Sequence, residues 1–369
     1  MNILIATDKF KGSLSSREAC GAIREGIERA RGKGVHEIRC IPVSDGGEGL
    51  TEALVGASGG RWKSVSTRDA LGEPIDARYG LSPDGKTAFV EMAEASGLAR
   101  LGERPLDPWR ASTFGTGEML RDAARQGVDR ILLGLGGSAT NDGGSGMALA
   151  MGFRFLDESG REIRELPERL PETASVKEPE TSPLPPVTVA CDVRNPLLGP
   201  EGSTRVYGPQ KGVAEDDYER HEARLAHLLE VLGPDAGRLA ARPGAGAAGG
   251  LGFGCLYFLR AGLEPGFELV ARALDLETAV KNADIVLTGE GRIDRQSLEG
   301  KAPHGVAELA KQHDKQRAAF CGSLEDTGLE EVFGPIYAIG DPELSLAENL
   351  ARGHESLVRA AAEMAARWE

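Results

Sequence analysis

Glycine-rich turns with polar side chains follow several apolar segments of the chain. The clearest is Leu133–Gly152, LGLGGSATNDGGSGMALAMG, which joins a strand-like apolar segment to an apolar helical pattern. Glycine lacks a Cβ atom, so consecutive backbone N–H groups can converge on an anion, and the amino end of a following helix favours negative charge. The side chains of Ser138, Thr140 and Asn141 could add hydrogen-bond donors. This stretch is therefore predicted to bind a phosphate group.

Three further glycine-bearing turns follow strand-like segments and read SDGGEG, ACDVRNPLLGPEG and TGEGRID. A tight turn without any ligand would explain any one of them equally well. In an open α/β sheet, however, the carboxyl ends of the strands line the crevice in which ligands bind. Four clusters that each end a strand therefore favour a shared ligand-binding cleft. The H-R-D and D-F-G triplets of protein kinases are absent, which argues against that class of phosphotransferase.

Composition narrows the classes of partner. Among 369 residues, Lys and Arg total 43 against 57 Asp and Glu, and the net charge of −14 opposes binding to a nucleic-acid backbone. The start, MNILIATDKF, resembles a buried strand, and no apolar run approaches the roughly 18 residues of a membrane helix. We therefore expect a cytoplasmic protein without nucleic-acid or membrane partners. Five scattered cysteines without C-x-x-C spacing are expected to be reduced core residues.

The elements that must position these turns form two kinds of pattern. Residues 1–60 hold two successive strand–turn–helix units, which predict a parallel sheet. The segments PIDARYGLS and KTAFVEMA, joined by SPDG, instead predict an antiparallel hairpin, and the strand–helix alternation returns after residue 282. We therefore predict an α/β fold of two domains: a discontinuous parallel-sheet domain of Rossmann or flavodoxin type, residues 1–60 and 283–369, and a large inserted α/β domain with a mixed sheet, residues 61–282, that carries the phosphate loop. The Pro- and Glu-rich residues 165–186 are expected to form an exposed excursion.

The first helix has a clear start signal. Ser15 is predicted to be its N-cap, and Glu18, three residues later, completes a capping box. The apolar residues that follow recur at helical spacing and should form its buried face: Ala19, Ala22, Ile23, Ile27 and Ala30.

Eight motifs, taken in order, strongly resemble the type 1 glycerate kinase family, the bacterial glycerate 2-kinases. They are TDKFKGSLSS, SDGGEG, FGTGE, GGSATNDGGSGM, CDVRNPLLGPEG, GPQKG, PGAGAAGGLG and TGEGRIDRQSLEGKAPHGV, and they run from Ile3 to about Ala338. The first motif of the family usually reads D-S-F-K-G-S. Lys9 stands at the position of its first serine here, whereas Lys11 and Ser13 match.

The resemblance implies a reaction and an architecture. The reaction is the ATP- and Mg²⁺-dependent transfer of the γ-phosphoryl group to the 2-hydroxyl of D-glycerate, which gives 2-phospho-D-glycerate and ADP. The architecture is two α/β domains with the active site in the intervening cleft.

Phosphoryl transfer needs a metal on the phosphates and a carboxylate that orients or deprotonates the attacking hydroxyl. Asp192, at the end of VTVACD, is the expected base, and Asp45 and Glu290 are better suited to hold magnesium. A helix N-cap or a turn-stabilising role explains each lone carboxylate equally well, Asp45 above all. The expected nucleotide-binding residues are Gly136, Gly137, Ser138, Thr140, Asn141, Gly143 and Gly144.

Cations must meet the phosphoryl group and the substrate carboxylate. Lys11 and Lys301 lie in glycine-bearing motifs and are the expected catalytic cations. Lys211, Arg292 and Ser13 are the expected contacts of glycerate, because a planar guanidinium matches a carboxylate and a lysine supplies a point charge. Isolated lysines are more commonly solvated surface charges, so these roles depend on the motifs.

Two other classes of function fit parts of the pattern. A kinase for a different hydroxy acid would keep the glycine-rich turns and change only the residues on the substrate side. A non-catalytic anion-binding or nucleotide-binding protein would need the glycines but not the ordered carboxylates and lysines.

Overall fold

The computed structural model describes residues 1–181, 184–298, 301–326 and 328–368. Within them the chain forms two compact units. Unit 1 comprises residues 1–45, 52–59 and 265–369, and unit 2 comprises residues 46–51 and 60–264. The chain thus leaves unit 1 near the expected residue 60. It returns at residue 265 rather than 283, because two further helices, α10 (Gly266–Ala273) and α11 (Leu276–Lys281), pack with α12 (Ala302–Gln312) of unit 1.

Unit 1 is built on a five-stranded, fully parallel sheet. Its strands in spatial order are β14 (Ile336–Ala338), β13 (Gln316–Leu324), β12 (Ile285–Ile293), β1 (Asn2–Ile5) and β2 (Glu37–Cys40). Numbered within the unit, this order is 2-1-3-4-5, the flavodoxin-like one, so the parallel domain expected from the sequence is present. The direction of winding reverses between β1 and β12. Ligands of such sheets bind beyond the carboxyl ends of the strands at this switch point.

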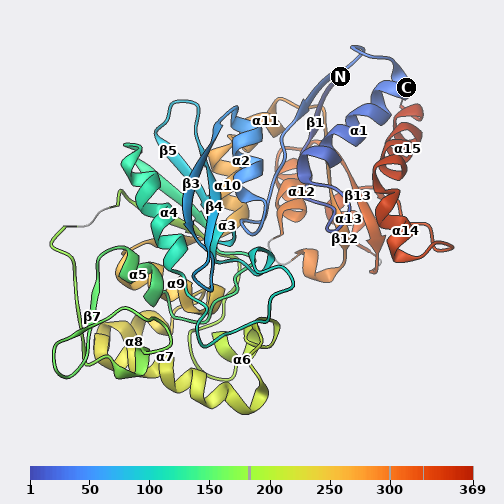
Figure 1. Cartoon of the computed structure of the whole chain (residues 1–369). Helices are drawn as coiled ribbons and strands as arrows, with labels where there is room; N and C mark the ends of the chain where they lie inside the picture. The colour runs from blue at the N-terminus through green and yellow to red at the C-terminus, as the bar shows by residue number, and fades with distance from the viewer. Residues whose placement is uncertain (182–183, 299–300, 327, 369) are drawn as a thin grey trace. The chain divides into compact units, whose positions relative to one another are not determined.

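Helices cover the sheet of unit 1, and its two termini lie side by side at one end of the unit (Figure 1). The Arg31 guanidinium donates to the carbonyl of Trp368, 2.8 Å away, which ties the ends of two helices together. Its remaining helices are α1 (Ser16–Arg31), α2 (Leu50–Ser58), whose first turn belongs to unit 2, α13 (Glu330–Phe333), α14 (Leu346–Ala351) and α15 (Gly353–Ala366), with a 3₁₀ turn at Arg295–Leu298.

The first helix starts as the sequence predicts. Ser15 accepts the N–H of Glu18, and the Glu18 carboxylate accepts the N–H of Ser15, so the capping box is complete. Four of the five expected core residues are buried, and Ala30 is exposed. Gly26 marks the close approach: a Cβ there would lie 2.3 Å from the Val358 carbonyl oxygen of α15.

Unit 2 contains a six-stranded mixed sheet. Its spatial order is β11 (Gly262–Glu264), β10 (Val187–Ala190), β6 (Arg130–Gly134), β5 (Thr87–Glu91), β4 (Pro74–Leu81) and β3 (Arg61–Arg68). β4 pairs antiparallel with β5, as the hairpin signal predicts, and also antiparallel with β3, whereas the first four strands are parallel. Its helices are α3 (Ala93–Ser96), α4 (Phe114–Arg125), α5 (Ser145–Ala150), α6 (Ser203–Tyr207), α7 (Tyr218–Leu232), α8 (Pro234–Ala240) and α9 (Ala247–Phe258), with 3₁₀ turns at Leu98–Arg100, Leu170–Glu172, Pro209–Lys211 and Glu215–Asp217.

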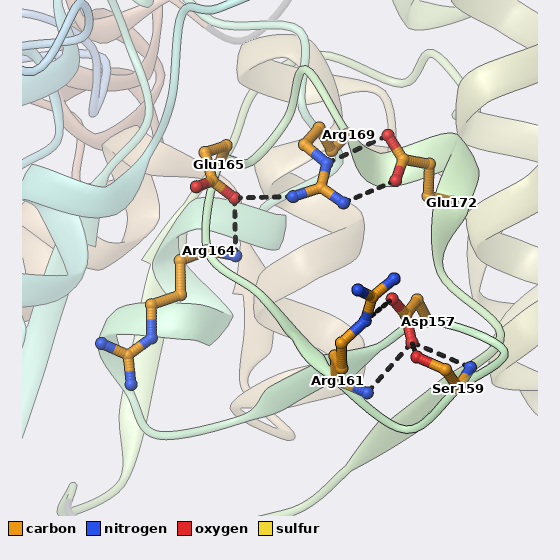
Figure 2. A network of polar contacts seen from close by, with 7 residues as sticks. All are labelled: Asp157, Ser159, Arg161, Arg164, Glu165, Arg169 and Glu172. Atoms are coloured by element: carbon orange, nitrogen blue, oxygen red, sulfur yellow. Dashed lines mark hydrogen bonds and ion pairs between the residues drawn. The ribbon is translucent and has the colours of Figure 1, made fainter.

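Part of the expected excursion is structured. A small antiparallel sheet is formed by β7 (Arg154–Leu156), β8 (Glu162–Ile163) and β9 (Ser175–Lys177). Polar side chains stabilise the turns beside this sheet (Figure 2). The Asp157 carboxylate accepts the N–H groups of Ser159 and Arg161 in the turn after β7. The Arg169 guanidinium donates to the carboxylates of Glu165 and Glu172. Such exposed ion pairs contribute little to stability, so this sheet depends on the burial of residues such as Leu170.

The crossing of α1 and α15 gives a test of the fold with an internal control. We expect Gly26→Ala to lower the free energy of unfolding by about 1–3 kcal/mol, because the new methyl group meets α15 backbone. Gly21→Ala, in the same helix with nothing within 4 Å of its Cβ position, should stabilise the protein by about 0.5–1 kcal/mol. Urea denaturation measures both values, and equal effects of the two substitutions would contradict this packing.

Candidate active site

Two buried carboxylates lie at the switch point of unit 1. Asp8 follows β1 and donates its backbone N–H to Gly289 of β12, 2.9 Å away, which places it beside Glu290. The two residues are only 8% and 9% exposed. Burial raises the pKa of Asp8 to about 7, and the negative charge of Asp45 and, more weakly, that of Glu290 add to the effect. This edge therefore concentrates negative charge in a poorly solvated place.

Lys301 provides the cation of this group. It precedes α12, and its Nζ lies 3.5 Å from Oε2 of Glu290. Burial raises the pKa of Glu290, and Lys301 opposes that shift. The other oxygen, Oε1, is buried without a hydrogen-bond partner among the described residues. A buried carboxylate oxygen without a donor is costly unless a cation or a donor from a ligand reaches it.

Arg292 has protein partners in this structure. Its guanidinium contacts Asp294 at 2.9 Å and Glu325 at 2.7 Å, and its side chain is 57% exposed. The proposed clamp on a substrate carboxylate would have to displace one of these two carboxylates. The sequence predicts that the Arg292 guanidinium binds a carboxylate. It does not show that Asp294 and Glu325 already supply that carboxylate.

The turn after β1 carries Lys11 and Ser13. Lys11 is exposed, and Ser13 is half-buried and donates its hydroxyl to the carbonyl of Leu350 at 2.7 Å. The same hydroxyl would lie 2.0 Å from a Cβ atom at Gly353. Ser13 thus joins this turn to α14 and the start of α15, whereas the Lys11 side chain extends toward solvent.

The predicted phosphate loop of unit 2 is open only at its start. Gly136 is half-buried and Gly137 is exposed with φ +74°, whereas residues 138–148 are all buried. The rest of the loop packs against the second glycine cluster: a Cβ at Gly144 would lie 2.7 Å from Gly254, and one at Gly250 would lie 2.8 Å from Gly143. The glycines at 143 and 144 therefore allow two backbones to approach closely.

Buried side chains brace this loop. The Asp142 carboxylate accepts the N–H groups of Thr113, Gly144 and Gly146 and the Thr113 hydroxyl. Asn141 donates to Thr204 at 3.0 Å. The Asn141 amide, which was predicted to donate to a bound phosphate, is therefore engaged in a contact within the protein.

Lys211 is a buried cation beneath the loop. It is 2% exposed and donates to Ser138 Oγ at 2.9 Å and to the carbonyl of Thr140 at 2.7 Å. Burial lowers the pKa of Lys211 to about 7, and the negative charge of Asp142 only partly offsets this. The expected contact of glycerate is thus a hydrogen-bonded core residue, and nothing in the motif GPQKG indicates this burial.

The predicted base Asp192 is exposed. It lies in the irregular segment after β10, two residues beyond the end of the strand at Ala190. Asn195 fixes this segment, because it accepts the Tyr207 hydroxyl at 2.6 Å and donates to the carbonyl of Glu201 at 2.7 Å. The carboxylate therefore lies beyond the carboxyl end of a central strand of unit 2, where ligands of α/β sheets bind.

One stretch carries the letters of a P-loop. Gly80–Thr87, GLSPDGKT, fits the pattern G-x-x-x-x-G-K-[ST], but it forms the antiparallel turn between β4 and β5. The turn is closed internally, since Asp84 accepts the Ser82 hydroxyl and the N–H of Lys86. No helix begins there, so the feature that a P-loop needs to hold phosphate is missing.

Two carboxylates were not singled out from the sequence. Asp8 is in the motif TDKFKGSLSS, directly after the first strand. A carboxylate at the carboxyl end of a parallel strand is a candidate site residue, and this position could have identified Asp8. Glu91 ends β5, is 8% exposed, and accepts the N–H groups of Gly49 at 2.9 Å and Thr51 at 2.7 Å. It thereby shapes the SDGGEG turn, and α2 begins only at Leu50, so Asp45 is not the N-cap of that helix.

The part of the chain with described placement contains no cluster of three or more His, Cys, Asp or Glu residues arranged to hold a metal ion. Its five cysteines are free. No described helix is both long and apolar enough to cross a membrane.

An open parallel sheet with buried acids and a lysine at its switch point is the arrangement of an α/β enzyme. The comparisons specify which: the model of the glycerate kinase family matches residues 3–369, and the chain belongs to that family. It is 43% identical to a glycerate kinase of Halalkalibacterium halodurans over 98% of this chain and 97% of that one, and 39% identical to a glycerate 2-kinase of Escherichia coli over 99% and 97%. The crystal structure of a putative glycerate kinase 2 from Salmonella typhimurium LT2 matches with a TM-score of 0.88 and 38% identity, over 99% of this chain and 97% of that one.

The burial of Lys211 predicts how stability changes with pH. Below pH 7 the folded and unfolded states both hold the proton, so the folded state bears the full cost of a buried ammonium group. Between pH 7 and the ordinary lysine pKa of 10.5, the unfolded state binds more protons, so stability rises with pH by up to about 1.4 kcal/mol per pH unit. In Lys211→Met this contribution is absent.

Urea denaturation at pH 6 and pH 9 measures the difference between the parent protein and Lys211→Met. We expect the parent to gain stability relative to the variant over this interval. Lys86→Met, at a lysine whose side chain is 67% exposed, is the control and should show no such change. A parent–variant difference that is the same at both pH values would contradict the lowered pKa.

Proposed function

We propose that this protein is a glycerate 2-kinase, which transfers the γ-phosphoryl group of ATP to the 2-hydroxyl of D-glycerate and releases 2-phospho-D-glycerate and ADP. The observation that carries the proposal is the buried pair of Asp8 and Glu290 beside Lys301, at the switch point of a sheet in a glycerate kinase family chain. Relatives named glycerate kinase or glycerate 2-kinase match nearly its whole length. An ATP-consuming reaction also fits a cytoplasmic protein.

In unit 1, the cations have distinct roles. Lys301, held by the Glu290 carboxylate at 3.5 Å, offsets negative charge that develops on the transferred phosphoryl group. Lys11 is exposed at the same edge of the sheet and can follow a phosphate without breaking an internal contact. Arg292 and Ser13 remain candidates for the glycerate carboxylate and hydroxyls, Arg292 by exchange of a carboxylate partner.

The acidic group of unit 1 fits a magnesium ion. Glu290 presents a buried oxygen without a donor, and Asp8 and Asp45 place further negative charge beside it. Mg²⁺ is usually bound by one or two carboxylates together with substrate phosphates and water, so the site does not need a full protein cage. When bound, the ion supplies charge neutralisation on the phosphates of ATP. Glu290 and Asp45 would hold it.

In unit 2, Asp192 is the proposed base and the loop at 136–144 the proposed nucleotide contact. Asp192 is an exposed carboxylate on a segment fixed by Asn195, which suits a group that orients or deprotonates the 2-hydroxyl. The exposed backbone of Gly136 and Gly137 is the part of the loop best placed to meet a phosphate. The other proposed residues of the loop, Ser138, Thr140, Asn141, Gly143 and Gly144, and Lys211 below it, would act by fixing its shape.

The reaction is tested with the purified protein, ATP, Mg²⁺ and D-glycerate. We expect phosphorus NMR to show 2-phosphoglycerate and ADP in equal amounts, because one phosphoryl group is transferred per ATP. Formation of 3-phosphoglycerate would contradict the regiochemistry. ATP consumption only with another hydroxy acid from a panel would instead identify a kinase for that acid, and no consumption with any member would favour a non-catalytic nucleotide-binding protein.

The matched variant is Asp192→Asn, which keeps the shape of the side chain and removes its charge. General-base assistance typically contributes about 10²–10⁴ in rate, so kcat should fall on that scale while the KM for ATP changes little. A kcat within a few-fold of the parent would remove Asp192 from the chemical step and leave the carboxylates of unit 1 as the candidates.

A further inference from the structure

A cavity of about 470 Å³ lies in unit 1 beside the switch point. It opens at the carboxyl ends of β12, β13 and β14 and is bounded on one side by the turn after β1 and on the other by the loop and helix that follow β14. This volume is within the range of sites for cofactor-sized ligands and is generous for a three-carbon acid. None of the predicted nucleotide-binding residues lies in it.

The floor of the cavity is bare backbone. Gly291, Gly322 and Gly340 lie side by side at the ends of three neighbouring strands: Gly340 donates its N–H to the carbonyl of Gly322, and a Cβ at Gly322 would lie 2.5 Å from the Gly291 carbonyl oxygen. The neighbouring strand occupies the Cβ positions of Gly322 and Gly340, so peptide backbone without side chains lines this part of the cavity. A planar heterocycle can lie against such a backbone surface more closely than a branched, tetrahedral acid can.

The walls of the cavity are apolar and unusually exposed. Leu346 is 74% exposed, the highest value among the large hydrophobic residues that are exposed in the described parts of the chain, and Leu324 is 37% exposed. Both line the cavity, together with the partly buried Leu350. Exposed apolar side chains around a hollow favour an apolar ring that removes them from water.

Polar groups occur at the rim. Asp341 accepts the N–H of Glu343 with Oδ1, so Oδ2 can accept a hydrogen bond from a sugar hydroxyl. Lys11 lies at the edge of the cavity, on the turn that follows β1. An apolar hollow with a carboxylate at one rim and an ammonium group at the other matches a nucleoside whose phosphates lead away past the lysine.

The cavity is held open by its own hydrogen bonds. The Asn349 amide donates to the carbonyls of Asp341, Leu344 and Ser345 and accepts the N–H of Asp341 at 2.8 Å. Ser13 fixes the neighbouring turn to Leu350. A preformed site of this kind does not spend binding energy on ordering a loop.

We propose that this cavity binds the adenine and ribose of the phosphoryl donor, with the purine on the glycine floor between Leu324 and Leu346 and the ribose at Asp341. The proposal rests on the proposed function for the identity of the donor. It assigns the nucleoside to unit 1.

Two variants disrupt the cavity by different means, one by charge and one by bulk. Leu346→Glu places a negative charge in the wall, and Ser323→Phe fills the hollow with an apolar ring from an exposed position at the end of β13. We expect each to raise the KM for ATP about tenfold or more, with kcat at saturating ATP and the KM for D-glycerate within a few-fold of the parent. Val35→Glu, at a residue that is 58% exposed in the same unit and outside the cavity, is the control and should leave all three values unchanged.

Saturation-transfer NMR with adenosine gives a readout that does not require catalysis. The adenine protons should receive saturation from the parent protein and from Val35→Glu, and much less from the two cavity variants. Equal transfer to all four proteins overturns the proposal, as does a rise in the KM for D-glycerate alone, which would make the cavity the acceptor site. A protein that binds adenosine here but phosphorylates no glycerate would retain the cavity and reject the proposed function.

Discussion

The burial of like charges at the switch point constrains the chemistry of unit 1. Asp8 and Glu290 are brought together because β1 and β12 are hydrogen-bonded parallel neighbours, and both carboxylates are largely removed from water. Removal from water disfavours the charged form of a carboxylate, which is the main reason why the pKa of both groups is raised, and neighbouring negative charges add to the effect. Lys301 reaches only one oxygen of Glu290, and the other is buried without a donor. The fold therefore maintains a site whose charge is completed only by a cation or by a ligand that carries one.

In unit 2, glycine residues allow two backbone segments to pack in direct contact. A Cβ at Gly249 of one glycine cluster would lie 1.8 Å from the Thr140 carbonyl oxygen in the other. The buried amine of Lys211 and the carboxylate of Asp142 then satisfy the loop from below. A rigid loop with a short exposed start at Gly136–Gly137 results. Glycine permits the same close backbone packing at the cavity of unit 1, where a Cβ at Gly322 would lie 2.5 Å from the Gly291 carbonyl oxygen.

The sequence predicts what local patterns determine. The capping box at Ser15 and the hairpin after residue 74 are both present, because caps and turns are local signals. The small sheet within residues 154–177 is not predicted, since strands of two or three residues carry too little periodicity. The burial of Lys211 and the partners of Arg292 also could not be predicted, because tertiary contacts decide which lysine leaves the surface and which arginine is already paired. Asp8 could have been predicted from its place after the first strand.

The need of the buried carboxylates for a cation is tested most directly by thermal unfolding with and without millimolar Mg²⁺, in the absence of nucleotide. A ligand that binds only the folded state raises the melting temperature, so Mg²⁺ should raise the Tm of the parent and of Glu37→Gln, a control at an exposed carboxylate in β2 of the same sheet. Glu290→Gln removes one of the repelling charges and one ligand, and its Tm should hardly respond to Mg²⁺. An equal rise of Tm in all three proteins would show that Mg²⁺ acts elsewhere and would contradict this account of the switch point.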